Sequence, residues 1–295
     1  MELRDYFAAG VSGKTSDSVG IEVETSFTDE SAGIDTPITF EKSQLLFAGM
    51  VSAGWSVTER KNGAITALRN NDGDTLTYEL GRQNLEISAA PCHKNYSIGH
   101  TQRALETLYE AGRAVLATPR FKPVLSTNED LLAVPDERDA RWIEIDGRKA
   151  LCPLATISSV QFTIEIPAER AIVCLNRLGE QLPRFLDSYE QESVWRTYVK
   201  ESNAGYDPSR YGGPIFFDSI EDYCEKLAMH DVVGEKRLVR QSPIINVPLF
   251  VRSIWWYFRL RRYGERLCIE VRPVSRRDDF RIASDLKMVL DILNL

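Results

Sequence analysis

The sequence predicts an α+β fold with a mainly antiparallel sheet. Strand-like stretches occur in clusters joined by short turns, and long amphipathic stretches lie between the clusters at uneven intervals. Regular alternation of single strands and helices would instead indicate a parallel sheet of the Rossmann type. The 295 residues include no tandem repeat and no low-complexity linker, so we expect a single domain over residues 1–295.

Six stretches alternate between apolar and polar residues in the way that is typical of a strand with one buried face. These are residues 19–27, 64–69, 75–80, 84–88, 158–166 and 266–272. The second and third stretches flank a segment from Asn70 to Asp74 that contains an Asp-Gly pair. Because Asp-Gly between two such stretches is typical of a tight turn, we expect a β-hairpin there.

Six other stretches carry apolar residues at helical spacing. These are residues 40–53, 96–117, 168–179, 184–198, 218–229 and 282–294. Pro183 separates the third from the fourth, because proline is disfavoured inside a helix. The fifth begins with Asp-Ser-Ile-Glu, which is similar to a capping box.

Composition argues against two classes of partner. The 36 basic and 43 acidic residues give a net charge of −7, which disfavours sequence-independent binding to nucleic acids. The basic run RLRRYGER at 259–266 lies beside aromatic residues, but a strand followed by a turn explains it better. No stretch approaches 18 apolar residues, and the N-terminus lacks a basic segment followed by an apolar one. We therefore expect a cytoplasmic protein with no membrane partner.

Three other signals for sites are weak. The five cysteines are odd in number and never in CxxC form, and the three histidines lack metal-site spacing. Residues 8–15, AAGVSGKT, satisfy a relaxed P-loop pattern. A P-loop needs a buried strand before it and a helix after it, whereas MELRDYF is a poor strand and the following residues themselves form a strand-like stretch. We expect no nucleotide site there.

Glutamates recur on the polar faces of the expected strands. In residues 19–27, Glu22 and Glu24 share one face, and Ile21 and Val23 share the other. The corresponding faces of the later strands carry Glu79, Glu86, Gln161, Glu165, Glu270 and Arg272. An antiparallel sheet commonly solvates one face, and that alone could explain the alternation.

The dominance of glutamate favours a site for cations over a merely solvated face. Carboxylates crowded together without compensating charge repel one another. Mg²⁺ takes oxygen ligands and is commonly held by one or two carboxylates together with substrate phosphates. The pattern therefore makes this face a candidate trough for a metal-bound nucleotide.

Six stretches in their order along the chain resemble the glutamate-cysteine ligase family, especially its plant-type branch. The first three are GIEVE at 20–24, LTYELGRQNLEISAAP at 76–91 and SSVQFTIEI at 158–166. The later three are YDPSRYGGP at 206–214, FDSIEDYCEKLAM at 217–229 and LFVRSIWWYFRLRRYGERLCIEVRPVS at 249–275. The resemblance implies a glutamine-synthetase-like catalytic domain. Such a domain has a curved, mainly antiparallel sheet, with helices on its convex face and Mg-ATP and the acid substrate on its concave face.

The resemblance also implies roles for individual residues. The metal-ligand positions of the family correspond to Glu22, Glu24, Glu86 and Glu270, with Glu79 and Gln161 as further expected ligands. Arg272 matches the arginine that faces the phosphates, and Gln83 and Arg259 are expected to contact the nucleotide. The stretches 60–64 and 203–214 are candidate closing loops, in which Lys61 and Arg210 could contact anionic groups or remain solvated.

The reaction implied by the resemblance is ATP-dependent amide formation through an acyl phosphate. The expected form is γ-glutamyl transfer to cysteine, with Mg²⁺ and ATP required and with small-molecule substrates as partners. Two alternatives remain open at this point. One is a metal-dependent hydrolase on the same fold, and the other is a protein that binds Mg-ATP without turnover.

Overall fold

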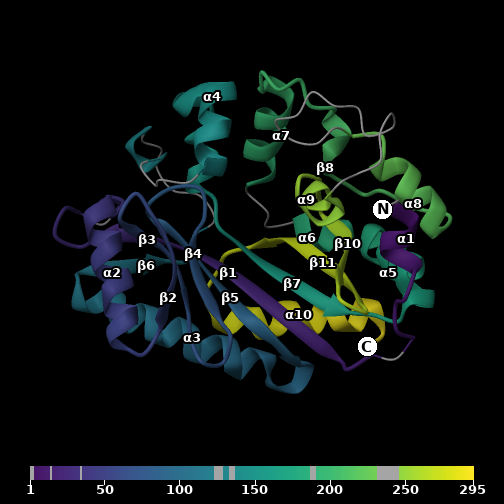
Figure 1. Cartoon of the computed structure of the whole chain (residues 1–295), viewed down its shortest axis with the longest axis horizontal. Coiled ribbons are helices and arrows are strands. Elements are labelled where there is room, and N and C mark those ends of the chain that lie inside the picture. Colours follow the sequence, from purple (N-terminus) through teal and green to yellow (C-terminus); the bar gives the residue numbers. More distant parts are fainter. Residues whose placement is uncertain are drawn as a thin grey trace. The chain divides into compact units, whose positions relative to one another are not determined.

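The computed structural model describes residues 3–13, 15–33, 35–122, 129–132, 137–186, 191–230 and 246–295 (Figure 1). The chain divides into two compact units. The first unit comprises Met1–Val19, Gln161–Val274 and Ser284–Leu295. The second unit comprises Gly20–Val160 and Ser275–Ala283.

The sheet of the second unit has the strand order β1-β5-β4-β3-β2, and β6 pairs with β1. The strands are β1 (Ser18–Asp29), β2 (Ser56–Lys61), β3 (Ala64–Arg69), β4 (Thr75–Tyr78), β5 (Asn84–His93) and β6 (Ala117–Arg120). The pairs β2–β3, β3–β4, β4–β5 and β1–β6 are antiparallel. Four of these strands confirm sequence predictions. The other two, β2 and β6, were not predicted because β2 is exposed on both faces and β6 has only four residues.

Two tight turns join neighbouring strands of this sheet. The predicted hairpin between β3 and β4 is confirmed, and Gly73 supplies a positive φ of 96° in its turn. The unpredicted hairpin between β2 and β3 turns at Asn62 and Gly63, whose φ angles of 48° and 84° are typical of a two-residue hairpin turn.

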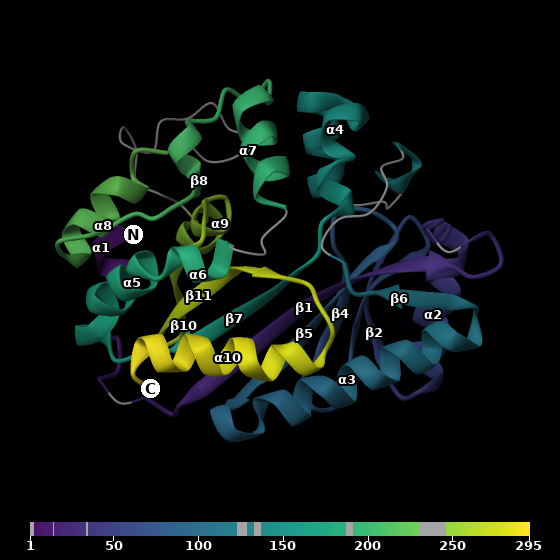
Figure 2. The ribbon, with the colours of Figure 1, turned by 180° about the vertical axis from the view of Figure 1, so that it is seen from behind.

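Two helices, α2 (Phe40–Ser52) and α3 (Lys94–Ala114), cover one face of the second unit's sheet. This unit also contains α4 (Glu137–Leu151) and the 3-10 turns η1 (Glu129–Leu132) and η2 (Leu154–Thr156). Figure 2 shows α3 running along the sheet. Phe27 of β1 packs against α3, and Tyr78 of β4 stacks on Phe47 of α2 at 4.8 Å between ring centroids. Because side chains alternate along a strand, Glu24 and Glu79 point to the opposite face, which we call the polar face.

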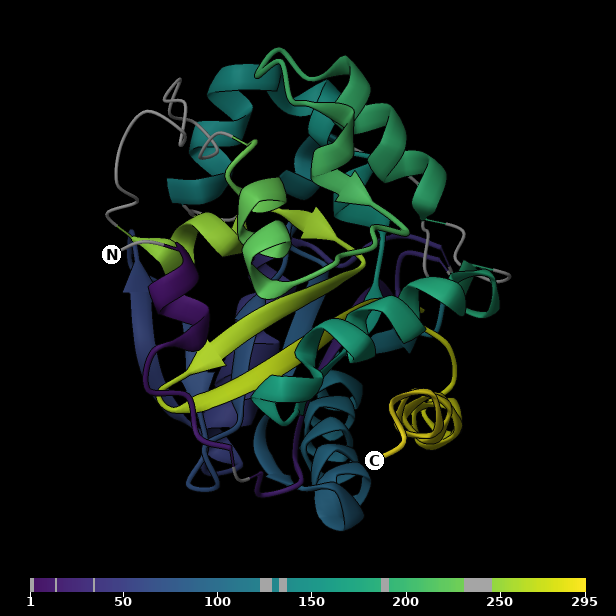
Figure 3. The ribbon, with the colours of Figure 1, turned by 90° about the vertical axis from the view of Figure 1, so that its right-hand side faces the viewer.

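The first unit contains the strand order β10-β11-β7 and a separate parallel pair, β8–β9. The strands are β7 (Ser159–Glu165), β8 (Tyr211–Gly212), β9 (Trp255–Trp256), β10 (Phe258–Tyr263) and β11 (Arg266–Ser275). Ser159 and Val160 of β7 and Ser275 of β11 belong to the second unit. Figure 3 shows β10 and β11 as a hairpin. The pairing is antiparallel, and its register places Arg259 opposite Glu270 and Arg261 opposite Cys268. The expected strand and turn at 259–266 are therefore confirmed.

Helices of the first unit follow the predicted pattern with three differences. They are α1 (Leu3–Ala8), η3 (Ala168–Arg170), α5 (Ala171–Glu180), α6 (Leu182–Leu186), α7 (Glu192–Glu201), η4 (Pro208–Arg210), α8 (Ile220–Leu227), α9 (Val247–Arg252) and most of α10 (Phe280–Leu293). The stretch predicted at 184–198 corresponds to α6 and α7, and residues 187–190 lie outside the described residues. Ser219 caps α8 by accepting from the Asp222 amide at 3.2 Å, as its sequence indicated. Helices α1 and α9 in this unit, and α4 in the second, were not predicted.

The elements around residues 8–15 exclude a P-loop. A helix, α1, precedes this segment, and a strand, β1, follows it. This is the reverse of the order that a P-loop requires. Lys14 lies outside the described residues.

The predicted fold class, α+β with a mostly antiparallel sheet, is confirmed. The curvature of a glutamine-synthetase-like sheet stays a prediction. Within the described ranges, no helix is both long and apolar enough to cross a membrane. None of the five cysteines, all of which are described, forms a disulfide.

Candidate functional site

Three of the predicted metal ligands meet on the polar face of the second unit. Glu24 belongs to β1, Glu86 to β5, and Glu79 directly follows β4. One carboxylate oxygen of each residue lies within 4.8 Å of the others. These three strands are neighbours in the order β1-β5-β4, so the sheet itself brings the carboxylates together. We call Glu24, Glu79 and Glu86 the acidic cluster.

Two of the three carboxylates in the acidic cluster are held by hydrogen bonds. Glu24 is only 8% exposed and accepts hydrogen bonds from the Ser159 amide and hydroxyl, both at 2.8 Å. The Ser88 hydroxyl donates to Glu86 at 2.6 Å. The alternative of a fully solvated polar face therefore does not describe this part of the sheet.

Electrostatics at the acidic cluster favour a cation. Burial raises the pKa of Glu86 well above its usual value, and the charges of Glu22, Glu79 and Glu24 raise it further. Such repulsion is relieved when a positive ion binds between the carboxylates. All the donors are oxygen atoms, which is the chemistry that Mg²⁺ prefers. The residues present thus fit the predicted metal.

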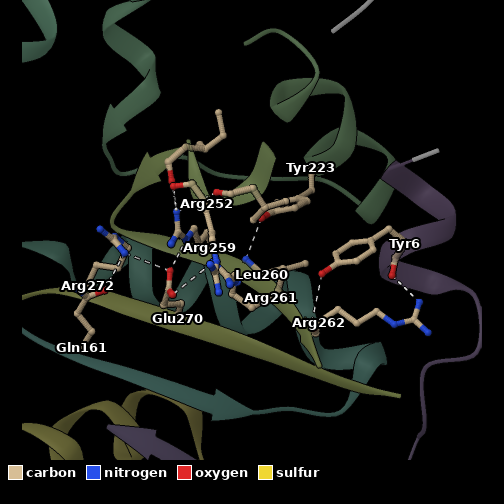
Figure 4. A network of polar contacts seen from close by, with 12 residues as sticks. Tyr6, Gln161, Tyr223, Arg252, Arg259, Leu260, Arg261, Arg262, Glu270 and Arg272 are labelled. Atoms are coloured by element: carbon tan, nitrogen blue, oxygen red, sulfur yellow. Dashed lines mark hydrogen bonds and ion pairs between the residues drawn. The ribbon is translucent and has the colours of Figure 1, made fainter. Parts of the chain in front are cut away.

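The predicted ligands Gln161 and Glu270 lie in the first unit, in a different environment. Glu270 is 3% exposed, and Arg259 Nε donates to its Oε2 atom (Figure 4). Arg272 Nη1 lies 3.4 Å from Glu270 Oε2 and donates to Gln161 Oε1 at 2.8 Å, and Arg261 Nη1 lies 3.9 Å from Glu270 Oε1. We call the three arginines around Glu270 the arginine cluster.

The arginine cluster disfavours Glu270 as a metal ligand. Burial acts to raise the pKa of Glu270, but the positive charges of Arg259, Arg272 and Arg261 outweigh it and lower the pKa to about 2. Glu270 is therefore an ionised carboxylate that three guanidinium groups already surround. A divalent cation would have to displace these groups or approach them against their charge.

Comparison with solved structures finds proteins of similar fold. The crystal structure of a bifunctional glutathione synthetase from Pasteurella multocida aligns with a TM-score of 0.53 and 12% identity. The alignment covers 94% of this chain and 39% of that one. This chain shares its fold with part of that synthetase. A novel glutamine synthase homologue aligns with a TM-score of 0.42 and 11% identity, over 99% of this chain and 58% of that one. No family model and no curated protein matches the sequence.

The environment of Arg259 corrects the expectation that it contacts a nucleotide. Its guanidinium is buried, and Nη1 donates to the carbonyls of Val251 at 2.9 Å, Arg252 at 3.2 Å and Ile254. Burial lowers the pKa of Arg259 to about 10, although Glu270 opposes this shift. Arg259 thus ties the C-terminal end of α9 to β10 and remains charged at neutral pH.

Gln83 also differs from its expected role as a nucleotide contact. Its side chain is fully buried, and its amide Nε2 donates to the Ala155 carbonyl. The backbone of Gly81 passes so close that an added Cβ would lie 2.9 Å from Gln83 Oε1, at a φ of 99°. Gln83 therefore packs the turn between β4 and β5 and is not exposed to a ligand.

The two cations of the candidate closing loops lie in ordered structure. Arg210 is 2% exposed, donates to the Ser253 carbonyl at 2.6 Å, and lies over the Tyr206 ring at 5.0 Å. This burial corrects the expectation that Arg210 reaches anions from a loop. Lys61 ends β2, with Nζ 3.7 Å from the Glu59 carboxylate, so the stretch 60–64 is a hairpin turn.

The sequence analysis did not identify two features of these sites, a second cluster of possible metal ligands and Arg261. Asp72, Asp74 and His100 form a second cluster of possible ligand atoms, but Asp74 already accepts from His100 at 2.6 Å and from the Ala90 amide at 2.8 Å. This cluster therefore closes the β3–β4 turn against β5 and α3. Arg261 was also missed, although its spacing of two from Arg259 in a strand places both on one face.

Proposed function

We propose that this chain is a Mg²⁺- and ATP-dependent carboxylate-amine ligase. The observation that carries the proposal is the acidic cluster, in which three carboxylates from neighbouring strands approach within 4.8 Å and the pKa of Glu86 is raised. The likeness in fold to part of a glutathione synthetase supports it. The motif resemblance to glutamate-cysteine ligases adds glutamate as the donor and cysteine as the acceptor.

The metal in this proposal is held by the second unit. Glu24, Glu79 and Glu86 would bind Mg²⁺, with Glu22 adding negative charge nearby. Mg²⁺ bound there neutralises phosphate oxygens and so lowers the repulsion between ATP and an anionic substrate. Ser159 and Ser88 keep two of the three carboxylates oriented before the ion arrives.

Arg272 is the residue proposed to contact the transferred phosphoryl group. It is the most exposed side chain of the arginine cluster, at 21%, and Gln161 and Glu270 hold one edge of its guanidinium. A planar guanidinium can donate two parallel hydrogen bonds to phosphoryl oxygens. Its positive charge is fixed in position before the reaction, which is the arrangement that stabilises a transition state most effectively.

The proposed reaction has two steps. A substrate carboxylate oxygen attacks the γ-phosphorus of ATP, the bond to the ADP oxygen breaks, and an acyl phosphate forms. The amine nitrogen then attacks the acyl carbon, inorganic phosphate leaves with the bonding electron pair, and the amine loses a proton to solvent. The net product is an amide, with one ATP converted to ADP and phosphate.

Measurement of ADP release tests this function directly. The protein is incubated with Mg-ATP, glutamate and a panel of amines, each component is omitted in turn, and product mass is read by mass spectrometry. We expect ADP release that requires both the acid and the amine, with a product lighter than their sum by one water. Binding of Mg-ATP without ADP release in any mixture, or amide cleavage without ATP, would contradict the ligase.

The variant Arg272→Lys tests the role of the guanidinium. A point charge cannot reproduce the planar fork, so we expect turnover to fall by about tenfold to a hundredfold with a smaller change in ATP affinity. Steady-state kinetics with varied ATP would separate the two effects. The same substitution at Arg266, an exposed residue of β11, is the control. A loss confined to ATP affinity would contradict a role in the transfer step.

A further inference from the structure

Asp72, Asp74 and His100 bring two carboxylates and an imidazole together outside the acidic cluster. Asp72 and Asp74 belong to the turn between β3 and β4, and His100 belongs to α3. One ligand atom of each residue lies within 4.8 Å of the others. We call these three residues the turn cluster. Carboxylates combined with an imidazole are typical of transition-metal sites, whereas Mg²⁺ is held by oxygen atoms alone.

The carboxylate of Asp74 is buried, and both of its oxygen atoms are held. Asp74 is 2% exposed. Its Oδ1 atom accepts from the Ala90 amide at 2.8 Å, and its Oδ2 atom accepts from the Asn70 side-chain amide at 2.8 Å. Carboxylates that bind metals are commonly oriented by hydrogen bonds of this kind. Asp74 therefore has a fixed orientation before any ion arrives.

His100 and Asp74 share a proton. Nε2 of His100 lies 2.6 Å from Asp74 Oδ1, and the His100 side chain is 13% exposed. Without a metal ion, this hydrogen bond joins α3 to the turn. A divalent cation can take the place of the proton, because it bonds to an imidazole nitrogen and to a carboxylate oxygen at the same time. The exchange releases the proton and keeps α3 linked to the turn.

Asp72 is the member of the turn cluster that a purely structural role does not explain. The hydrogen bond that closes the turn needs only Asp74 and His100. Asp72 is exposed, and it makes no hydrogen bond or ion pair within the ranges that the structure describes. Its carboxylate nevertheless lies close to that of Asp74. Two carboxylates at this separation repel each other, and a cation bound between them would remove the repulsion.

We propose that the turn cluster is a second metal site, which binds a divalent transition-metal ion such as Zn²⁺ through Asp72, Asp74 and His100. The ion fastens the β3–β4 turn to α3 inside the second unit. The imidazole selects Zn²⁺ over Mg²⁺, so this site and the acidic cluster bind different ions. The site is independent of the proposed ligase, because none of its residues takes part in that reaction.

Two further groups border the turn cluster. Nη2 of the exposed Arg103 lies 3.4 Å from His100 Nδ1, so its positive charge opposes an ion bound to this imidazole. Burial, and then the charge of Asp74, raise the pKa of the Cys92 thiol. The thiol is thus near enough to Asp74 to sense its charge. Because thiols also bind Zn²⁺, Cys92 has to be tested separately.

Titration with Zn²⁺ in the presence of excess Mg²⁺ tests the site, with free Zn²⁺ read from a competing chromophoric chelator. We expect Zn²⁺ affinity to fall at least about tenfold in Asp72→Asn and in His100→Asn, because each variant loses a ligand. Asp72→Asn removes no hydrogen bond of the described residues, so its Tm without metal should equal that of the wild type. It therefore tests the site even if His100→Asn does not fold. Zn²⁺ should raise the Tm of the wild type more than that of either variant.

Three other variants separate this site from its neighbours. His93→Asn is the matched control, because the exposed His93 caps α3 by accepting from the Asn95 amide and asparagine can cap in the same way. Its Zn²⁺ affinity should be unchanged, as should that of Cys92→Ala. Arg103→Gln should bind Zn²⁺ more tightly, because it removes the opposing charge.

Any of three results would overturn the site. These are no Zn²⁺ binding by the wild type, equal Zn²⁺ affinity in Asp72→Asn and the wild type, and loss of Zn²⁺ binding in Cys92→Ala alone. ADP release is measured separately, so a protein that binds Zn²⁺ through the turn cluster and never releases ADP would retain this site and reject the ligase.

Discussion

Glu86→Gln is expected to stabilise the metal-free protein and to remove most of its response to Mg²⁺. The neutral amide keeps the size of the side chain but no longer repels Glu22, Glu24 and Glu79. We expect Tm without metal to rise by about 2–4 °C, the change that ~1 kcal/mol produces in a protein of roughly this size. Mg²⁺ affinity should fall at least about tenfold, because the ion loses a charged ligand. Thermal unfolding over a range of Mg²⁺ concentrations measures both effects.

The pH dependence of the metal-free protein gives a second measure of the same carboxylate. The folded-state pKa of Glu86 lies above its unfolded value of 4.5. Above about pH 4.5 the unfolded chain releases this proton while the folded chain retains it, so stability falls as pH rises toward the folded-state pKa. Glu86→Gln should lack this loss, and the difference in Tm between variant and wild type should grow from pH 5 to pH 7.

Glu106→Gln supplies the matched control for this experiment. Glu106 is an exposed residue of α3 in the same unit, so its substitution should change neither Tm nor the Mg²⁺ response. If Glu86→Gln bound Mg²⁺ as tightly as the wild type, the acidic cluster would not be the metal site.

Glu270→Gln should destabilise the protein by about 3–5 kcal/mol, because it leaves three guanidinium groups without their buried counter-charge. Chemical denaturation at neutral pH measures this change. Glu265→Gln, at the exposed turn of the same hairpin, should be neutral. Equal stability of the Glu270→Gln variant and the wild type would show that the arginines do not depend on this carboxylate.

The Glu270 effect should weaken in acid. The folded-state pKa of Glu270 is about 2, below its unfolded value of 4.5, so its contribution is complete above about pH 4.5 and declines as pH falls toward 2. The gap in stability between wild type and Glu270→Gln should begin to close below pH 4.5. Adding Arg261→Met to Glu270→Gln should recover part of the lost stability, since it removes one of the unbalanced charges.

Much of the fold could be predicted from local patterns in the sequence. All six predicted strands are present, and the polar alternation correctly placed Glu24, Glu79 and Glu86 opposite the face that α2 and α3 cover. Short elements such as α1 and β2 were not predicted, because neither has enough periodic apolar residues to produce a signal. Their position depends on neighbours that are distant in sequence.

The candidate site, too, was only partly predictable from local sequence. The sequence by itself determined which side chains share a face, because alternation in a strand is a local property of the backbone. Only the tertiary structure decided which strands are neighbours. It gathered Glu24, Glu79 and Glu86 into one cluster and surrounded Glu270 with arginines. It also buried Arg259 behind the carbonyls of α9. These environments depend on contacts between residues far apart in the chain, and they set the charge and hydrogen bonding of each group more strongly than its identity does.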